Sequence, residues 1–233
     1  MDLYNGFINE INGIAANGRS FPYVPGQACP MTDSGTLILS KDSAFELGGA
    51  GLPAVNATLF TTEDMQDEVV LCGKDIGEIS SDTPYARVAV ICLDSGALPD
   101  EDGLYRSLKD VELVKYRVFP EGCLLRLSPE SRREQLRVSR TAVKNGLSLK
   151  NIGFTFIEQY KKDPVVKAVK IIFFTDKDTD YKALERAASR SAAVTSSLNR
   201  IFDGMEISCD TCELKPVCDE VEGLRKLHFG KDV

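Results

Sequence analysis

The chain has 233 residues and a formal net charge of -7, with 28 Lys and Arg against 35 Asp and Glu. A nucleic-acid-binding surface needs an excess of cations to neutralise phosphates, so we expect no nucleic-acid partner, and an acidic surface suits a protein partner better. No stretch carries the ~18 consecutive apolar residues of a membrane span, and no basic and apolar signal region opens the chain. The sequence therefore predicts a soluble, cytoplasmic protein with one large core or two small ones.

The first half of the sequence predicts one helix followed by short strands. Apolar residues at helical spacing indicate a helix over residues 2–15, and three prolines and two glycines indicate a loop over residues 21–35. A helix through residues 104–111 and an extended segment at residues 114–127 are predicted further on. Between the loop and that helix, β-like runs predict strands at residues 36–39, 44–47, 57–61, 69–72 and 87–93.

The second half predicts helices around one strand. Ser139 and Ser148 are candidate N-caps of two successive helices, since a serine oxygen can accept a hydrogen bond from a free backbone N–H of the first turn. The apolar run at residues 165–175 predicts a strand. A helix of about 24 residues should then begin at residue 178 or 179 and end at Gly204.

These elements predict an α/β fold, with α+β as the alternative: mixed sheets flanked by helices, followed by a Cys-rich carboxyl-terminal tail. We divide the chain into three segments. Residues 1–35 form an N-terminal helix and loop, residues 36–135 a β-rich α/β domain, and residues 136–233 a second α/β unit that ends in the tail.

Five arginines gather within fifteen residues of the sequence: Arg126, Arg132, Arg133, Arg137 and Arg140. One interpretation is the solvated face of a helix, the usual meaning of a run of charges. The other is an anion-binding site, because the guanidinium group matches pairs of phosphate oxygens. The sequence leaves both interpretations open.

Four cysteines stand singly in apolar or turn segments. Such cysteines are usually reduced thiols that pack as small hydrophobic side chains. We expect this role for Cys29, Cys72, Cys92 and Cys123.

The carboxyl-terminal stretch has the spacing of a metal site. Cys209, Cys212 and Cys218 follow the pattern Cys-x2-Cys-x5-Cys, and His228, the single histidine, lies ten residues further on. A tight turn lets two thiolates bind one metal, and a third thiolate and an imidazole can complete the site. In a reducing cytoplasm this spacing favours metal binding over a disulfide. The alternatives for the cysteines are three reduced thiols without metal or an adventitious Cys209–Cys212 disulfide formed in air, and His228 could instead cover an apolar patch.

Five blocks of sequence occur over roughly residues 40–230: residues 44–49 (Ala-Phe-Glu-Leu-Gly-Gly), 71–76 (Leu-Cys-Gly-Lys-Asp-Ile), 137–146 (Arg-Val-Ser-Arg-Thr-Ala-Val-Lys-Asn-Gly), 150–153 (Lys-Asn-Ile-Gly) and 169–176 (Val-Lys-Ile-Ile-Phe-Phe-Thr-Asp). In this order, and followed by a cysteine cluster, they resemble the middle part of acetyl-CoA synthase. That protein is the beta subunit of the carbon monoxide dehydrogenase/acetyl-CoA synthase complex.

The resemblance implies an iron-sulfur site in the tail. The family's block runs Cys-x2-Cys-x8-Cys-x9-Cys and holds a [4Fe-4S] cluster bridged to two nickel ions. Cys209 and Cys212 match its first pair, but five residues precede Cys218, and His228 takes the place of a fourth cysteine ten positions later. The family's later Cys-Gly-Cys motif, which holds the distal nickel, has no counterpart before Val233. Nickel and full synthase activity are therefore not expected from this chain alone.

Two functions follow as hypotheses, and neither assigns a catalytic residue. The first is an acetyl-CoA synthase-like protein of anaerobic one-carbon metabolism, which binds an iron-sulfur cluster or another metal in an accessory or electron-transfer role. Its implied partners are carbon monoxide dehydrogenase/acetyl-CoA synthase or corrinoid-protein components. The second is a zinc-stapled protein-binding module without redox activity. The CO-methylating acyltransferase activity of the family would need nickel ligands from another chain.

Overall fold

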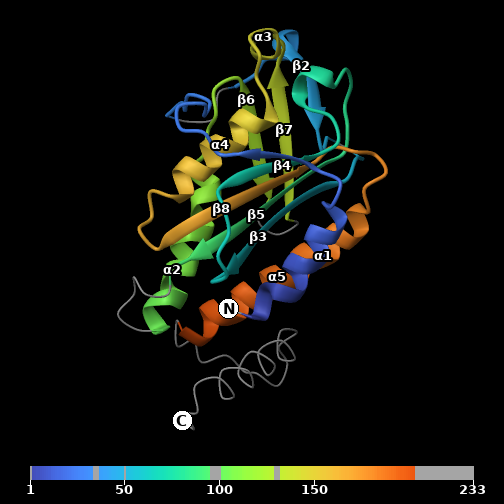
Figure 1. Ribbon diagram of the computed structural model, residues 1–233. Coiled ribbons are helices and arrows are strands. Elements are labelled where there is room, and N and C mark those ends of the chain that lie inside the picture. Colours follow the sequence, from blue (N-terminus) through green and yellow to red (C-terminus); the bar gives the residue numbers. More distant parts are fainter. Residues whose placement is uncertain (1, 34–36, 50, 95–100, 129–131, 203–233) are drawn as a thin grey trace.

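The structure is a computed structural model that describes residues 2–33, 37–49, 51–94, 101–128 and 132–202. Helices flank two sheets, a mixed five-stranded sheet and a three-stranded antiparallel sheet (Figure 1). The predicted α/β fold with mixed sheets is thereby confirmed, whereas the Cys-rich tail lies outside the described residues. Within those ranges, no helix combines the length and apolar character that a membrane crossing requires.

The five-stranded sheet forms the centre of the protein. Its central strand β8 runs parallel to β4 and antiparallel to β5, and β3 pairs in parallel with β5 at one edge. Strands β3 and β5 are buried along their whole length, as expected for apolar strands covered on both faces. In spatial order the strands are β1 (Arg19–Pro22), β4 (Glu68–Cys72), β8 (Val166–Phe174), β5 (Tyr85–Leu93) and β3 (Ala54–Thr61).

The smaller sheet places the arginine-rich stretch beside the edge strand β3. Its order is β2 (Ser43–Leu47), β7 (Arg133–Ser139) and β6 (Cys123–Ser128), and β7 contacts both β3 and β5. Along β7, buried Glu134 and Leu136 alternate with half-buried Arg133 and Arg137. The prediction of a solvated helical face is therefore wrong, because the alternation has the period of two that belongs to a strand.

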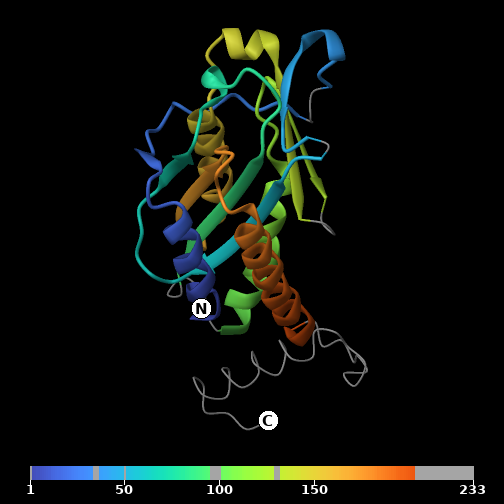
Figure 2. The same cartoon turned by 90° about the vertical axis from the view of Figure 1, so that its right-hand side faces the viewer.

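Two layers of helices cover opposite faces of the large sheet (Figures 1 and 2). Helix α4 (Leu149–Tyr160) packs on β4 and β8, with Gly153 against Val69. Helices α1 (Asn5–Ile14) and α5 (Tyr181–Phe202) lie side by side on the other face, where Gly18 meets Val70. Neighbouring residues of a strand point to opposite faces of the sheet. Val69 and Val70 are neighbours on β4, so Val69 faces the α4 layer and Val70 faces the other layer.

Short elements complete the fold. Helix α2 (Glu101–Leu113) contacts α5, and the 3-10 turn η5 (Val114–Arg117) contacts α4 beside β3. The prediction of an extended segment from residue 114 is wrong at residues 114–117, which form this turn. The prediction of a strand at residues 36–39 is also wrong, because residues 37–39 do not belong to a strand. Ser139 and Ser148 accept N-cap hydrogen bonds, as predicted. The remaining elements are α3 (Arg140–Lys144), η1 (Asp2–Tyr4), η2 (Ser40–Asp42) and η3 (Ile76–Glu78).

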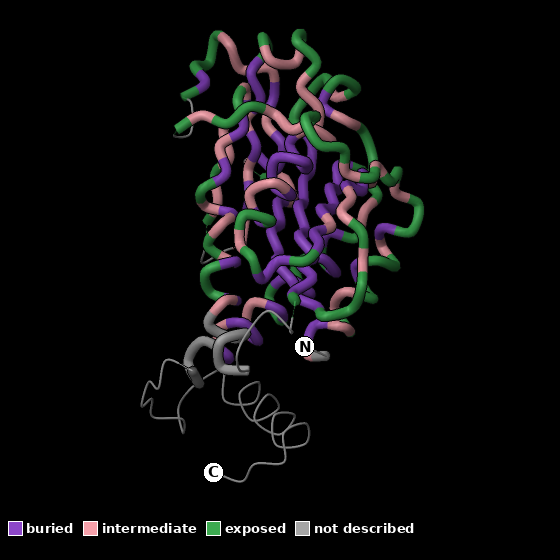
Figure 3. The backbone as a smooth tube through the Cα atoms, turned by 60° about the vertical axis from the view of Figure 1, so that its left-hand side comes forward, coloured by how far each residue is buried: buried purple, intermediate pink, exposed green. Residues whose placement is uncertain are grey.

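Burial is continuous through the large sheet and the helix layers that cover it, as Figure 3 shows. Strands from all three predicted segments share this sheet: β1 from the first, β3, β4 and β5 from the second, and β8 from the third. The division of the chain into three segments stays a prediction.

Gly153 marks the closest approach of α4 to the sheet. A Cβ atom at this position would lie 2.4 Å from Val69 Cγ2 and 3.1 Å from Phe173 Cε2. We expect Gly153→Ala to lower the free energy of unfolding by about 1–3 kcal/mol, because overpacking outweighs the gain in helix propensity. Gly13→Ala in α1 is the matched control, since nothing lies within 4 Å of its Cβ position. Urea unfolding of both variants measures the difference, and a Gly153→Ala protein as stable as Gly13→Ala would contradict the packing argument.

Candidate functional site

A fully buried ion pair joins the two sheets. Arg87 on β5 and Glu134 on β7 both have side chains with 0% exposure. Arg87 Nε donates to Glu134 Oε1 at 2.8 Å, and Arg87 Nη2 donates to Oε2 at 2.5 Å. The arrangement is the bidentate fork that guanidinium and carboxylate groups form best.

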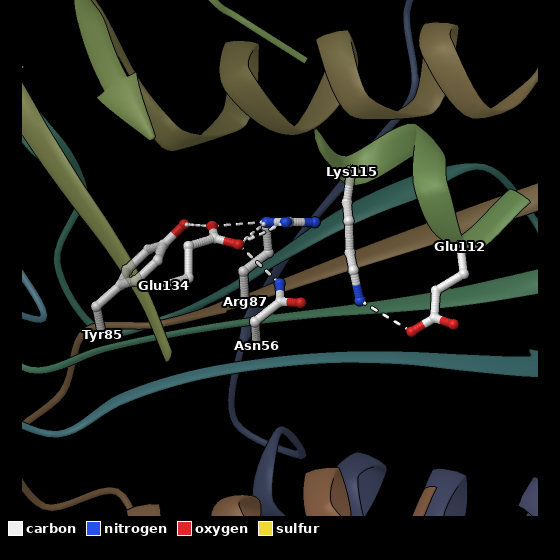
Figure 4. Close-up of polar contacts among 6 residues, drawn as sticks. All are labelled: Asn56, Tyr85, Arg87, Glu112, Lys115 and Glu134. Carbon is white, nitrogen blue, oxygen red and sulfur yellow. Dashed lines mark hydrogen bonds and ion pairs between the residues drawn. The ribbon is translucent and has the colours of Figure 1, made fainter. Parts of the chain in front are cut away.

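Other groups complete the shell of this pair (Figure 4). Tyr85 OH donates to Glu134 Oε1 at 2.9 Å, and Asn56 Nδ2 donates to Oε2 at 2.7 Å. The ring of Phe156 on α4 lies 3.8 Å from the guanidinium carbon of Arg87. Burial and the neighbouring Glu134 raise the pKa of Tyr85 well above its ordinary value. Burial lowers the pKa of Arg87, but the carboxylate of Glu134 outweighs this effect and raises it overall. Tyr85 therefore remains a neutral donor, and Arg87 remains charged.

Three buried polar atoms next to this network make no hydrogen bond of standard geometry among the described residues: Arg87 Nη1, Tyr160 OH and Thr58 Oγ1. They nevertheless lie close together, because burial raises the pKa of Tyr160 while the charge of Arg87 and side-chain hydrogen bonds with Arg87 and Thr58 lower it. Buried polar groups are usually satisfied, and these three lie near enough to interact with one another.

A cleft of about 270 Å³ lies along the free edge of β3, and we call it the β3 cleft. Asn56, Ala57 and Thr58 form its β3 wall, and residues of α5 form another. The turn η5 and the ends of β6 and β7 close the remaining sides. Because β3 is an edge strand, one side of its backbone faces this space instead of another strand.

The lining of the β3 cleft is cationic, although the chain as a whole is acidic. Among the described residues, Lys115, Arg132 and Arg133 line it together with one carboxylate, that of Glu112. The Lys115 residue is only 7% exposed, and its Nζ lies 3.1 Å from Glu112 Oε1. An ammonium group has three donors, and among the described residues Lys115 Nζ donates only to Glu112, so two donors are left for a ligand. Arg132 has the φ angle of 50° that is rare for a residue with a side chain.

Both arginines are held in place by contacts within the chain. Arg133 Nη2 donates to the carbonyl of Leu52 at 2.9 Å, and Arg132 Nη1 donates to Ser189 Oγ at 3.3 Å. The Arg132 carbonyl accepts from the N–H of Asn56 at 2.8 Å, which ties its turn to β3. A guanidinium has five N–H donors, so each of these contacts leaves the group able to bind a ligand oxygen.

The structure separates the five clustered arginines. Only Arg132 and Arg133 line the β3 cleft. Arg137 pairs with Glu46 on β2, Arg140 donates to the carbonyl of Ser43, and Arg126 is exposed on β6. Only two of the five can therefore belong to an anion site in this cleft, and Lys115, which sequence reasoning missed, joins them from the separate turn η5.

A larger hollow of about 730 Å³ lies between the loop at residues 28–32 and α3, and several of its polar groups bind one another or the backbone. Asp42 accepts hydrogen bonds from the hydroxyls of Ser139 and Thr141. Asn151 donates to the carbonyl of Gln27. Specific ligand sites need free polar groups that converge, so the smaller β3 cleft is the better candidate.

The predicted metal ligands Cys209, Cys212, Cys218 and His228 lie outside the described residues. Within the described ranges, no three Cys, His, Asp or Glu side chains gather as metal ligands. The other four cysteines are free thiols, as predicted: Cys92 and Cys123 are buried, and Cys29 and Cys72 are half-buried. Burial raises the pKa of Cys29 and of Cys72 to about 11, so both remain protonated at neutral pH.

Comparison with known proteins places the chain in no family. No family model matches it, and no curated protein sequence does. The functional argument therefore rests on the residues of the β3 cleft and, for the tail, on sequence spacing.

Proposed function

We propose that the protein binds a small phosphorylated molecule in the β3 cleft. The presence of Lys115, Arg132 and Arg133 in the lining of one cleft carries this proposal. Among the described residues of that lining, these three cations accompany one carboxylate, in a chain whose net charge is -7. Phosphate oxygens are the natural partners of such a set, because guanidinium groups bind them in pairs and an ammonium supplies a point charge.

The size of the cleft limits the ligand. Its volume of about 270 Å³ lies just below the ~300–1,000 Å³ typical of sites for drug-sized molecules. A phosphorylated compound of a few carbon atoms matches this space. Ser128 and Ser196 also line it, and their hydroxyl groups can bind the uncharged part of the ligand.

Calorimetric titration with propyl phosphate tests the proposal. At about pH 8 the phosphate carries close to two charges, and we expect saturable binding of one molecule per chain. Because the attraction is largely electrostatic, affinity should fall as salt is added. Propanol is the neutral control and should give no binding heat. The absence of saturable binding at low salt would refute the proposal.

The Cys-x2-Cys spacing favours a second proposal, which concerns the tail. We propose that Cys209, Cys212, Cys218 and His228 hold a [4Fe-4S] cluster or a zinc ion. The protein would then be an acetyl-CoA synthase-like accessory or electron-transfer module in the cytoplasm of an anaerobe, working with carbon monoxide dehydrogenase/acetyl-CoA synthase or corrinoid-protein components. If the metal is zinc, the site would instead stabilise the fold of a protein-binding module that has no redox activity. Three thiolates and an imidazole suit either metal centre.

Metal analysis of protein purified without oxygen separates these outcomes. Iron with absorbance near ~400 nm indicates the cluster, and about one zinc per colourless chain indicates the staple. The double variant Cys209→Ser, Cys212→Ser should lose the metal. If its metal content equals that of the wild type, both forms of this second proposal fail.

A further inference from the structure

We infer that the β3 wall of the cleft is a subsite for a hydroxyl group, so that the ligand is a small phosphorylated alcohol. This inference rests on the proposed phosphate site at Lys115, Arg132 and Arg133. It names the chemistry of the other end of the ligand, which those three cations do not specify.

The side chain of Asn56 directs its amide oxygen away from the buried ion pair. Asn56 lines the cleft, although only 6% of the residue is exposed. Its Nδ2 donates to Glu134 Oε2, and because an ionised carboxylate can only accept, this bond fixes which end of the amide is the nitrogen. Figure 4 shows the nitrogen on the side of Glu134 and the oxygen on the side of Lys115, another residue of the cleft lining.

The amide oxygen of Asn56 is free to accept a hydrogen bond. Among the described residues no group donates to Oδ1, and this oxygen is not one of the enclosed polar atoms that lack a partner. Lys115 Nζ donates to Glu112 instead. An acceptor that is unpartnered and not enclosed is reached through the cleft that Asn56 lines, so a ligand atom there should be a donor.

The backbone of Thr58 adds an acceptor and a donor to the same wall. In a parallel pair, alternate residues of a strand bond the neighbouring strand. Tyr85 N–H on β5 donates to the carbonyl of Pro53, whereas Asn56 N–H donates away from β5, to the carbonyl of Arg132. Thr58 lies two residues after Asn56, so its N–H and C=O point to the same free edge, and Thr58 also lines the cleft.

A hydroxyl group matches this set of atoms. It can donate to Asn56 Oδ1 or to the Thr58 carbonyl, and it can accept from the Thr58 N–H. A ketone or ether oxygen can only accept, so it would leave both acceptors without a donor. A doubly ionised phosphate also lacks a donor, which places it at the cationic lining and leaves the β3 wall to the other end of the ligand.

Three phosphate esters with three carbon atoms each test the subsite. Glycerol phosphate carries hydroxyl groups, methoxyethyl phosphate carries an ether oxygen, and propyl phosphate carries neither. We expect the wild-type protein to bind glycerol phosphate about tenfold more tightly than propyl phosphate in calorimetric titrations, because only its hydroxyl groups can donate to the wall. Methoxyethyl phosphate should bind no more tightly than propyl phosphate.

The variant Asn56→Leu assigns this preference to the β3 wall. It removes Oδ1 and keeps the approximate size of the side chain. The preference for glycerol phosphate should fall, while the affinity for propyl phosphate should stay unchanged, which also shows that the variant is folded. By contrast, Arg132→Gln should weaken both ligands by the same factor.

Amide NMR of the wild type gives the same assignment without a substitution, and so covers the case in which Asn56→Leu does not fold. Hydrogen bonding to Oδ1 polarises the amide group. The side-chain amide signals of Asn56 should therefore shift more with glycerol phosphate than with propyl phosphate.

The outcomes separate this inference from the proposed function. If glycerol phosphate binds no more tightly than either of the other esters, or shifts the Asn56 amide no more than propyl phosphate does, the inference is overturned and the phosphate site stays intact. A preference that survives in Asn56→Leu would overturn it too, and would place the hydroxyl group at Ser128 or Ser196 of the lining. If none of the three esters binds, the inference and the proposed function both fail.

Discussion

Glu134→Ala is expected to lower the free energy of unfolding by about 3–5 kcal/mol, the largest effect we predict for a single substitution. The substitution removes the carboxylate that accepts from Arg87, Tyr85 and Asn56, and it leaves the guanidinium charge buried without a counter-ion. The cost arises mainly from this uncompensated charge rather than from the strength of the ion pair itself. Urea unfolding monitored by circular dichroism measures it.

Two further variants isolate that cause. Glu46→Ala breaks the half-exposed pair with Arg137 and should cost only about 0–1 kcal/mol. The double variant Arg87→Met, Glu134→Leu removes both charges and should recover most of the stability that Glu134→Ala loses. A Glu134→Ala protein no less stable than Glu46→Ala would show that Arg87 is not buried as a charge.

Lys115→Met is expected to weaken propyl phosphate binding by about 10–100-fold, because it removes a charge-assisted hydrogen bond of about 1.5–3 kcal/mol. Methionine keeps much of the apolar stem, and Lys115 is already 93% covered, so packing in the turn should change little. The effect should be on affinity rather than on stability. Calorimetric titration of the variant, alongside its urea unfolding curve, measures both.

Arg126→Gln is the matched control for this second substitution. Arg126 belongs to the same cluster of arginines in the sequence, but it is exposed on β6 and is not among the residues that line the cleft. Its replacement should change affinity by less than about twofold, since an exposed charge outside the site acts mainly through screened long-range attraction. Equal losses in Lys115→Met and Arg126→Gln would mean that phosphate binds non-specifically to surface charge.

The layered α/β fold could be predicted from local patterns. The apolar run at residues 165–175 and the long helix after it are both confirmed, as β8 and α5. The caps at Ser139 and Ser148 are confirmed too. These features depend on neighbours in the sequence, which is why propensity and capping rules find them.

The candidate site could be predicted only in part. Two of the arginines face an anion-sized cleft, but Lys115 reaches it from another element, and no local pattern specifies that meeting. Glu134 was also missed, although a signal exists. Glu134 and Leu136 are two residues apart on β7 and therefore point to the same, buried face of the strand. An acidic residue on a buried face requires a buried cation as its partner. Arg87, within an otherwise apolar strand, is the cation that such reasoning would have chosen.

The resemblance to acetyl-CoA synthase and the metal site at Cys209 to His228 remain predictions. They rest on the order of short sequence blocks and on cysteine spacing. The β3 cleft is argued from different residues, so the metal analysis and the phosphate titrations are independent of each other.

Titration of the isotopically labelled protein with propyl phosphate, followed by amide NMR, tests the β3 cleft most directly. We predict saturable shifts for the amides of Thr58, Lys115, Tyr116 and Arg133, which line the cleft from three elements. The amides of Arg137 and Arg140, which lie outside it, should stay in place. Shifts centred on those two residues, or no saturable shift in any amide of the cleft lining, would contradict the assignment of the β3 cleft as the ligand site.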